Sequence, residues 1–233
     1  MSTPGRETFR LAELAPRLVG EGEAGALVEA ARGVLAGPGD ADVLARAVGF
    51  ALDADGAPLE LSFISLYTAL ESALTFFRRQ DEYKIFAGPD FARFESELRG
   101  WLRRHPLLAG DPARRGLLYE KARELNRYPF SHVFARFRER QGLDLSDLWP
   151  LVGPADEWPL VEIRHRLVHG DPFRSRPAES VVCARAHLRW TVCRMILSLL
   201  GWPVESSLVG PAGLAARAGA TYAAWREERA KFA

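Results

Sequence analysis

Several features are scarce in this sequence of 233 residues. Its only cysteines, Cys183 and Cys193, lie on one predicted helix about 15 Å apart along the helix axis, so they cannot form a disulfide with each other. We interpret them as two core thiols. His165 and His169 alone lack the acidic or thiolate residues that accompany them in a zinc site, so the sequence predicts no metal site and no cofactor, although a histidine pair at this spacing could still bind a stray metal ion.

Long apolar runs are missing as well. No run approaches the roughly 18 residues of a membrane span, and the Met1 end has no basic and apolar signal segment. We therefore expect a cytoplasmic protein with no membrane association. A phosphate-binding glycine loop and a Gly-x-Ser-x-Gly elbow are also absent, which leaves nucleotide hydrolysis and serine hydrolase chemistry without sequence support.

Charge of one sign is not in excess, because the formal net charge is only +1. Any nucleic-acid binding must therefore come from a local basic surface. Arginine nevertheless outnumbers lysine by 28 to 3. The planar guanidinium suits phosphate binding, but a GC-rich genome or a thermophilic habit would produce the same bias without any ligand.

Apolar residues recur at three- and four-residue spacing along the chain, and this periodicity predicts an all-α fold. Helices are expected over residues 11–18, 24–35, 58–79, 90–104, 112–126, 131–140, 157–169, 178–200 and 213–232, with one more segment capped by Asp40 or Asp42 and ending at Leu52. We divide the chain into an N-terminal helical appendage (1–40), a helical domain (41–203) and a C-terminal loop and helix packing on the body (204–233).

The stretch 161–170 closes an apolar and basic helix on a histidine and a glycine. Asp156 is the expected N-cap, Pro159 suits the first turn, and Gly170 is expected to end the helix. Leu160, Ile163 and Leu167 would then face the core.

His165 and His169 would share another face of this helix, one turn apart. If the last turn unwinds slightly at Gly170, Arg164 and His169 converge on one anion. Glu71 lies at the edge of the apolar stripe of the 58–79 helix, where a carboxylate is costly without a cation. Arg164 or His169 is a candidate partner for it, and a solvated carboxylate or a bridge to a neighbouring arginine is the alternative.

Arg164, followed directly by polar His165 and after a short spacer by His169, resembles the motif of the HEPN superfamily. Residues 66–71, Leu-Tyr-Thr-Ala-Leu-Glu, are similar to a stretch in HEPN proteins of phage-defence type. The resemblance covers residues 41–203. It implies a HEPN-like helical bundle, here with helical extensions at both ends, and a family whose members are often metal-independent ribonucleases.

The resemblance implies an endoribonuclease in which the ribose 2′-OH attacks the adjacent phosphate. His169 would act as general base or acid, Arg164 would stabilise charge on the phosphate, and His165 and Glu71 would complete the site. Arg166, Arg174 and Arg176 are the expected RNA contacts. Similar domains dimerise, so a homodimer across the motif helix is expected, and an antitoxin or defence protein is a further candidate partner. The alternative is a non-catalytic helical module for protein or nucleotide binding.

Overall fold

The computed structural model describes residues 14–15, 17–36, 41–79, 84–170 and 178–232. These residues form helices and connecting segments, with one isolated β-bridge between Lys84 and Arg127. The all-α prediction is therefore confirmed. Within the described ranges, none of the helices combines the length and the apolar composition that a transmembrane span requires.

The chain divides into two compact units. The main unit comprises residues 1–80 and 136–233, and the hairpin unit comprises residues 81–135. Both boundaries fall inside the segment 41–203 that we predicted as one domain. Helix α7 (Phe130–Gln141) continues from the hairpin unit into the main unit.

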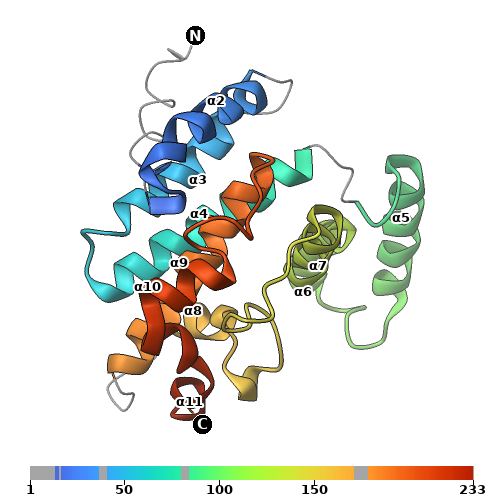
Figure 1. Ribbon diagram of the computed structural model, residues 1–233. Helices are drawn as coiled ribbons and strands as arrows, with labels where there is room; N and C mark the ends of the chain where they lie inside the picture. The colour runs from blue at the N-terminus through green and yellow to red at the C-terminus, as the bar shows by residue number, and fades with distance from the viewer. Residues whose placement is uncertain (1–13, 16, 37–40, 80–83, 171–177, 233) are drawn as a thin grey trace. The chain divides into compact units, whose positions relative to one another are not determined.

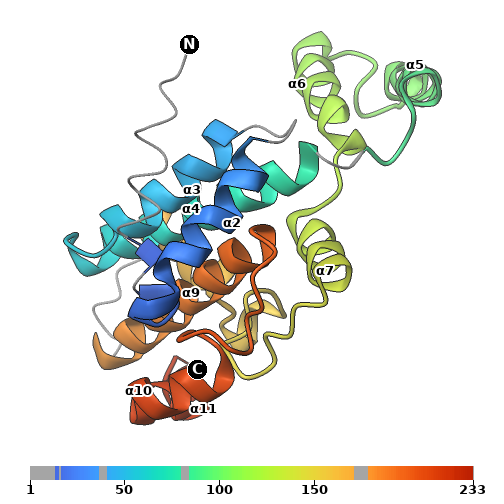
Figure 2. The same cartoon turned by 45° about the horizontal axis from the view of Figure 1, so that its top comes forward.

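Three helices form the core of the main unit (Figures 1 and 2). Helices α3 (Ala41–Asp53), α4 (Leu59–Arg79) and α9 (Ala178–Leu199) pack against one another. The apolar stripe predicted for α4 is packed except at its start: Leu59 is half-buried, whereas Phe63, Leu66, Leu70, Ala73 and Phe77 are at most 1% exposed. Full burial of a large apolar side chain contributes about 1.5–3 kcal/mol, so this stripe is a main source of the unit's stability.

Helix α9 is the most deeply buried helix of this core, and it ends where the sequence predicts. Gly201 adopts a left-handed conformation with φ 70°, and the Trp202 N–H donates to the Leu197 carbonyl at 3.0 Å. This bond satisfies a carbonyl at the helix end that would otherwise lack a partner. Val182 is 49% exposed, because the first turns of the helix bury a single side that includes Cys183 and His187.

The C-terminal tail is not the single helix predicted over residues 213–232. It forms α10 (Pro211–Ala223) and α11 (Trp225–Ala230), with a non-helical backbone at Gly219 (φ 36°, ψ −106°) inside the first. This conformation is open to glycine because it lacks a Cβ. Both helices contact α9, and Trp225 is buried.

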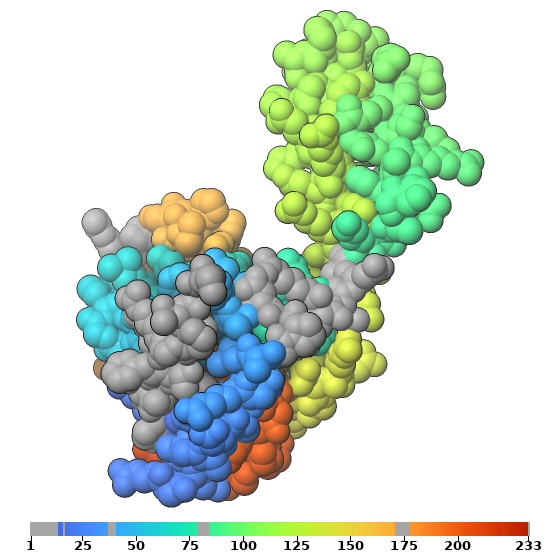
Figure 3. Space-filling model, turned by 90° about the horizontal axis from the view of Figure 1, so that it is seen from above, coloured from blue at the N-terminus to red at the C-terminus, as the bar shows by residue number. Residues whose placement is uncertain are grey.

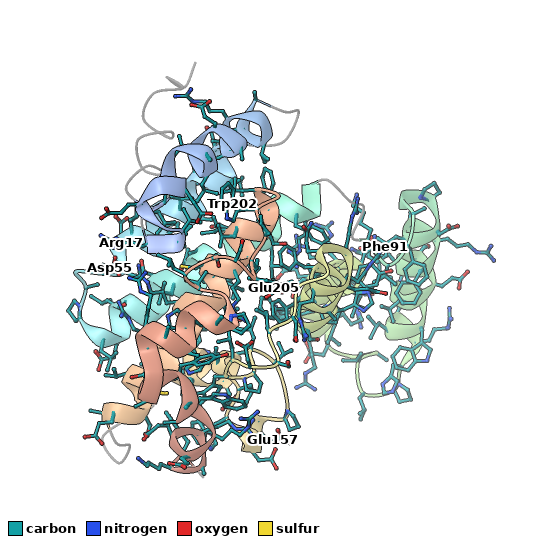
Figure 4. The ribbon with its side chains drawn as sticks, in the orientation of Figure 1. Arg17, Asp55, Phe91, Glu157, Trp202 and Glu205 are labelled. Atoms are coloured by element: carbon teal, nitrogen blue, oxygen red, sulfur yellow. The ribbon has the colours of Figure 1, made fainter. Side chains whose placement is uncertain are left out.

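The N-terminal part of the main unit is attached through the turn between α3 and α4. Helix α2 (Ala24–Leu35) has the predicted bounds. Of the predicted helix over 11–18, residues 14, 15, 17 and 18 are described and are helical, and the other four lie outside the described residues. Arg17 and Arg189 both form ion pairs with Asp55, and Figure 4 shows Arg17 and Asp55 side by side. Arg185 donates to the Ala54 carbonyl at 3.0 Å, so α9 holds this turn from several points.

The hairpin unit consists mainly of α5 (Gly88–Arg104) and α6 (Pro112–Ala122), which lie against each other (Figure 3). Asp111 caps α6 by accepting from the Arg114 N–H at 2.9 Å. A 3₁₀ helix, Arg123–Asn126, follows α6, and the Asn126 side chain accepts from the Phe86 N–H at 2.8 Å. This bond ties the end of the unit back to its beginning.

Candidate functional site

The motif helix is α8 (Leu160–Val168), and the loop before it sets its direction. Trp158 adopts a left-handed conformation with φ 52°, and its carbonyl accepts from the Trp149 indole N–H at 2.8 Å. The Leu160 N–H donates to the Pro150 carbonyl at 2.9 Å, which satisfies one of the N–H groups that a helix start leaves open. Leu160 and Ile163 are fully buried, and α8 packs against α4.

The helix begins three residues later than predicted. Residues Ala155–Glu157 form a separate 3₁₀ turn, and Pro159 takes the N-cap position of α8. Asp156 is therefore not the N-cap, and no side chain caps this helix start. The left-handed backbone at Trp158 separates the two helical segments, and a tryptophan gives no sequence signal for that conformation.

Gly170 ends α8 as predicted, but the last turn of the helix does not unwind there. Gly170 has φ 72°, in the left-handed region where glycine ends helices. The last turn does not unwind, since the His169 N–H still donates to the His165 carbonyl at 3.1 Å. Both histidines are exposed, and their ring centroids lie 4.4 Å apart. The shared face predicted for this pair is confirmed.

Arg164 lies on a different side of the helix from this pair. Its guanidinium stands over the Tyr67 ring of α4, 5.1 Å from the ring centroid. Five residues of helix place Arg164 and His169 about 140° apart around the axis, and with the last turn closed the His169 ring contacts His165. The expected convergence of Arg164 and His169 within one chain is therefore not present in this structure.

Tyr67 connects the motif helix to the second predicted part of the site. The residue is only 3% exposed, and burial raises the pKa of its phenol. The negative charge of Glu71 raises this pKa further, whereas the positive charge of Arg164 lowers it. Glu71 and Arg164 thus both act electrostatically on the same phenol.

Glu71 itself is exposed on α4. Among the residues that the structure describes, neither Glu71 nor Arg164 has an ion-pair partner. The exposed carboxylate corresponds to the solvated alternative rather than to a direct bridge with Arg164 or His169. Arg164 therefore keeps a positive charge that no described carboxylate neutralises by direct contact.

Of the three arginines expected to contact RNA, Arg166 is the one that the structure describes. Arg166 donates to the Glu162 carboxylate at 2.7 Å, and its guanidinium stacks on Trp158 at 4.1 Å from the ring centroid. The positive charge of Arg166 is therefore partly neutralised by the Glu162 carboxylate. Arg174 and Arg176 lie outside the described residues.

A buried polar network around Arg194 was not identified from the sequence. Arg194 of α9 is 0% exposed and donates two hydrogen bonds to the Asp147 carboxylate, at 2.7 and 2.6 Å. The Tyr222 hydroxyl donates to the same carboxylate at 2.5 Å. Burial alone would raise the pKa of Asp147, but these hydrogen bonds outweigh it and hold the pKa below its usual value. A lone arginine within the apolar sequence 191–200 was the available signal.

His187 is a packing residue of α9. It is 0% exposed and lies against the rings of Trp149, Trp190, Tyr222 and Trp225. Its Nδ1 accepts from the Trp149 backbone N–H at 3.1 Å, and its Nε2 faces the Thr221 carbonyl at 3.2 Å. Both ring nitrogens are therefore used within the fold.

The two cysteines are free and buried, as predicted. Burial raises the pKa of Cys183 to about 11 and that of Cys193 to about 12, so both thiols stay protonated at neutral pH. A nucleophilic role for either thiol has no support, because the thiolate is the reactive form. In the described part of the chain, no three His, Cys, Asp or Glu side chains gather as a metal site would require.

Comparison with family models, with curated proteins and with solved structures finds no match to this chain.

Proposed function

We propose that this chain is a metal-independent endoribonuclease with a HEPN-like site at the C-terminal end of α8. The observation that carries the proposal is the grouping of Arg164, His165 and His169 on one short helix, with both imidazoles exposed and Arg164 without a neutralising carboxylate among the described residues. A cation and proton-transfer groups are what cleavage at a ribose phosphate needs.

In the proposed reaction, the ribose 2′-OH attacks the adjacent phosphorus and the bond to the 5′-oxygen breaks. One imidazole removes the proton of the 2′-OH, and another delivers a proton to the leaving 5′-oxygen. His169 follows the last turn of α8, and we assign it the proton-donor role. Arg164 would stabilise the charge that develops on the phosphate.

The two imidazoles of one chain are not placed to serve both roles at once. Attacking and leaving oxygens lie roughly in line on opposite sides of phosphorus, whereas His165 and His169 are in contact on one face. We therefore propose a homodimer across the motif helix, in which each copy supplies one imidazole to a shared cleft. Arg164 of the second copy would then act beside His169 of the first, so Arg164 and His169 of one chain need not converge.

The second candidate is a non-catalytic helical module that binds protein or nucleotide. It is favoured by the position of Arg164, which stacks on buried Tyr67 and is directed away from the histidines.

On either proposal, the cytoplasm and a role in phage defence or a toxin–antitoxin pair remain the proposed setting. Arg166, Arg174 and Arg176 remain the proposed contacts to the RNA backbone.

Pooled RNA incubated with the protein in EDTA distinguishes the two candidates. We expect cleavage by the wild type and by His132→Ala, and none by His169→Ala. His132 is a suitable control because it is also exposed, and it stacks on Tyr128 in the other unit. Cleavage by all three proteins would point to a contaminant, and cleavage by none would favour the binding module.

A further inference from the structure

The two histidines of α8 form a pair that the proposed reaction does not fully explain. They lie one helical turn apart, with ring centroids 4.4 Å apart and ring planes inclined by 56°. Both side chains are exposed. Neither imidazole forms a hydrogen bond or an ion pair with any of the residues described. Ring nitrogens on both side chains are therefore available to an external ligand.

We infer that His165 and His169 together bind one divalent transition metal ion of the Zn²⁺, Ni²⁺ and Cu²⁺ class. Imidazole nitrogen is a preferred donor for these ions. Two histidines four residues apart on a helix present their rings on one face, which is the arrangement that helical zinc sites use for two of their ligands. Among the described residues, no third His, Cys, Asp or Glu joins the pair.

The electrostatics of the helix end allow a cation at this position. His165 lies in the last turn of α8, and His169 is its C-cap, so helix carbonyls direct partial negative charge toward the pair. Of the two neighbouring arginines, Arg166 is paired with Glu162 at 2.7 Å. Arg164 is held over Tyr67 of α4.

The other three histidines of the chain lack this arrangement. His187 is fully buried and uses both ring nitrogens. His105 accepts at Nδ1 from the Leu107 N–H at 3.3 Å. His132 is exposed but stacks on Tyr128 rather than on another histidine. His132 is therefore a matched control for the loss of one exposed imidazole.

Calorimetric titration of the tag-free full chain with Ni²⁺ tests the site. We expect one ion per chain for the wild type and for His132→Ala. Because loss of even an outer-shell partner weakens metal binding by about 10- to 100-fold, removal of one of two ligands should weaken it at least about tenfold. His165→Ala and His169→Ala should both show this loss. No binding by the wild type, or equal binding by all four proteins, would overturn the site.

A regulatory consequence of this site rests on the proposed function. A metal ion bound to both imidazoles occupies the nitrogens that transfer protons, so Zn²⁺ should inhibit RNA cleavage and EDTA should restore it. The calorimetric result does not depend on cleavage, so the two proposals can fail separately. Ni²⁺ binding without any RNA cleavage would keep the metal site and remove the ribonuclease. Cleavage without Ni²⁺ binding would do the reverse.

Discussion

Lowering the pH should destabilise the main unit through one buried imidazole, that of His187. Its two hydrogen bonds require the neutral ring, because Nδ1 accepts from the Trp149 N–H and the proton must sit on Nε2 to reach the Thr221 carbonyl. Burial lowers the pKa of His187 from 6.5 to about 4. The bond to Thr221 and the charge of Asp147 oppose this shift, and Arg194 adds to it.

The direction of the effect follows from proton binding in the two states. The unfolded chain takes up a proton on this ring near pH 6.5, whereas the folded chain takes it up only near pH 4. Stability from the neutral ring is therefore fully present above the unfolded pKa and is lost as the pH falls toward the folded pKa. With about 1.4 kcal/mol for each pKa unit, the loss is about 2 kcal/mol at about pH 5 and about 3 kcal/mol at about pH 4.

Urea unfolding of the wild type and of His187→Asn, followed by circular dichroism over this pH range, isolates the effect. The asparagine oxygen can replace Nδ1 as acceptor for Trp149, but the bond to Thr221 is lost, at a cost of about 1–3 kcal/mol at neutral pH. All other titrating groups remain. The free-energy gap between the two proteins should therefore narrow by about 2 kcal/mol on going to about pH 5. Parallel stability curves would refute this account of His187.

Three further predictions concern the buried network and the proposed site. Arg194→Met leaves the Asp147 carboxylate without its main partner and should lower the free energy of unfolding in urea by about 3 kcal/mol. This is the low end for a broken buried pair, because Asp147 is partly exposed. A loss below about 1 kcal/mol would contradict this. Arg164→Lys keeps the charge but not the planar fork, so the rate of RNA cleavage should fall more than about tenfold; an unchanged rate would make Arg164 structural. Mixing inactive Arg164→Ala with inactive His169→Ala chains should partly restore cleavage if the cleft is shared, and a stable mixed dimer that stays inactive would exclude the shared cleft.

Periodicity was sufficient to predict most helices, because burial of one apolar face determines them. Helix α2 has the predicted bounds, and α4 and α9 differ from prediction by one residue at one end. The errors occur where the backbone conformation of a single residue determines where a helix begins or is interrupted. Trp158 is left-handed without being glycine, and Gly219 interrupts an alanine-rich helix that its neighbours would otherwise continue.

The geometry around the candidate site residues was only partly predictable from the sequence. Spacing placed His165 and His169 on one face, and their rings are in contact. The position of Arg164 depends on Tyr67, almost a hundred positions earlier in the chain, and no local pattern contains that contact. The pair of Arg194 with Asp147 is likewise long-range. Such contacts arise from tertiary packing, which periodicity does not encode.

The ends left on a short RNA after incubation with the protein in EDTA test the central claim most directly. Attack by the 2′-OH predicts a 2′,3′-cyclic phosphate on one fragment and a 5′-hydroxyl on the other, both visible by mass spectrometry. These products should be absent when His169→Ala replaces the wild type. Fragments with a 5′-phosphate and a 3′-hydroxyl, or the same products from His169→Ala, would contradict a ribonuclease that uses the histidine at the end of α8.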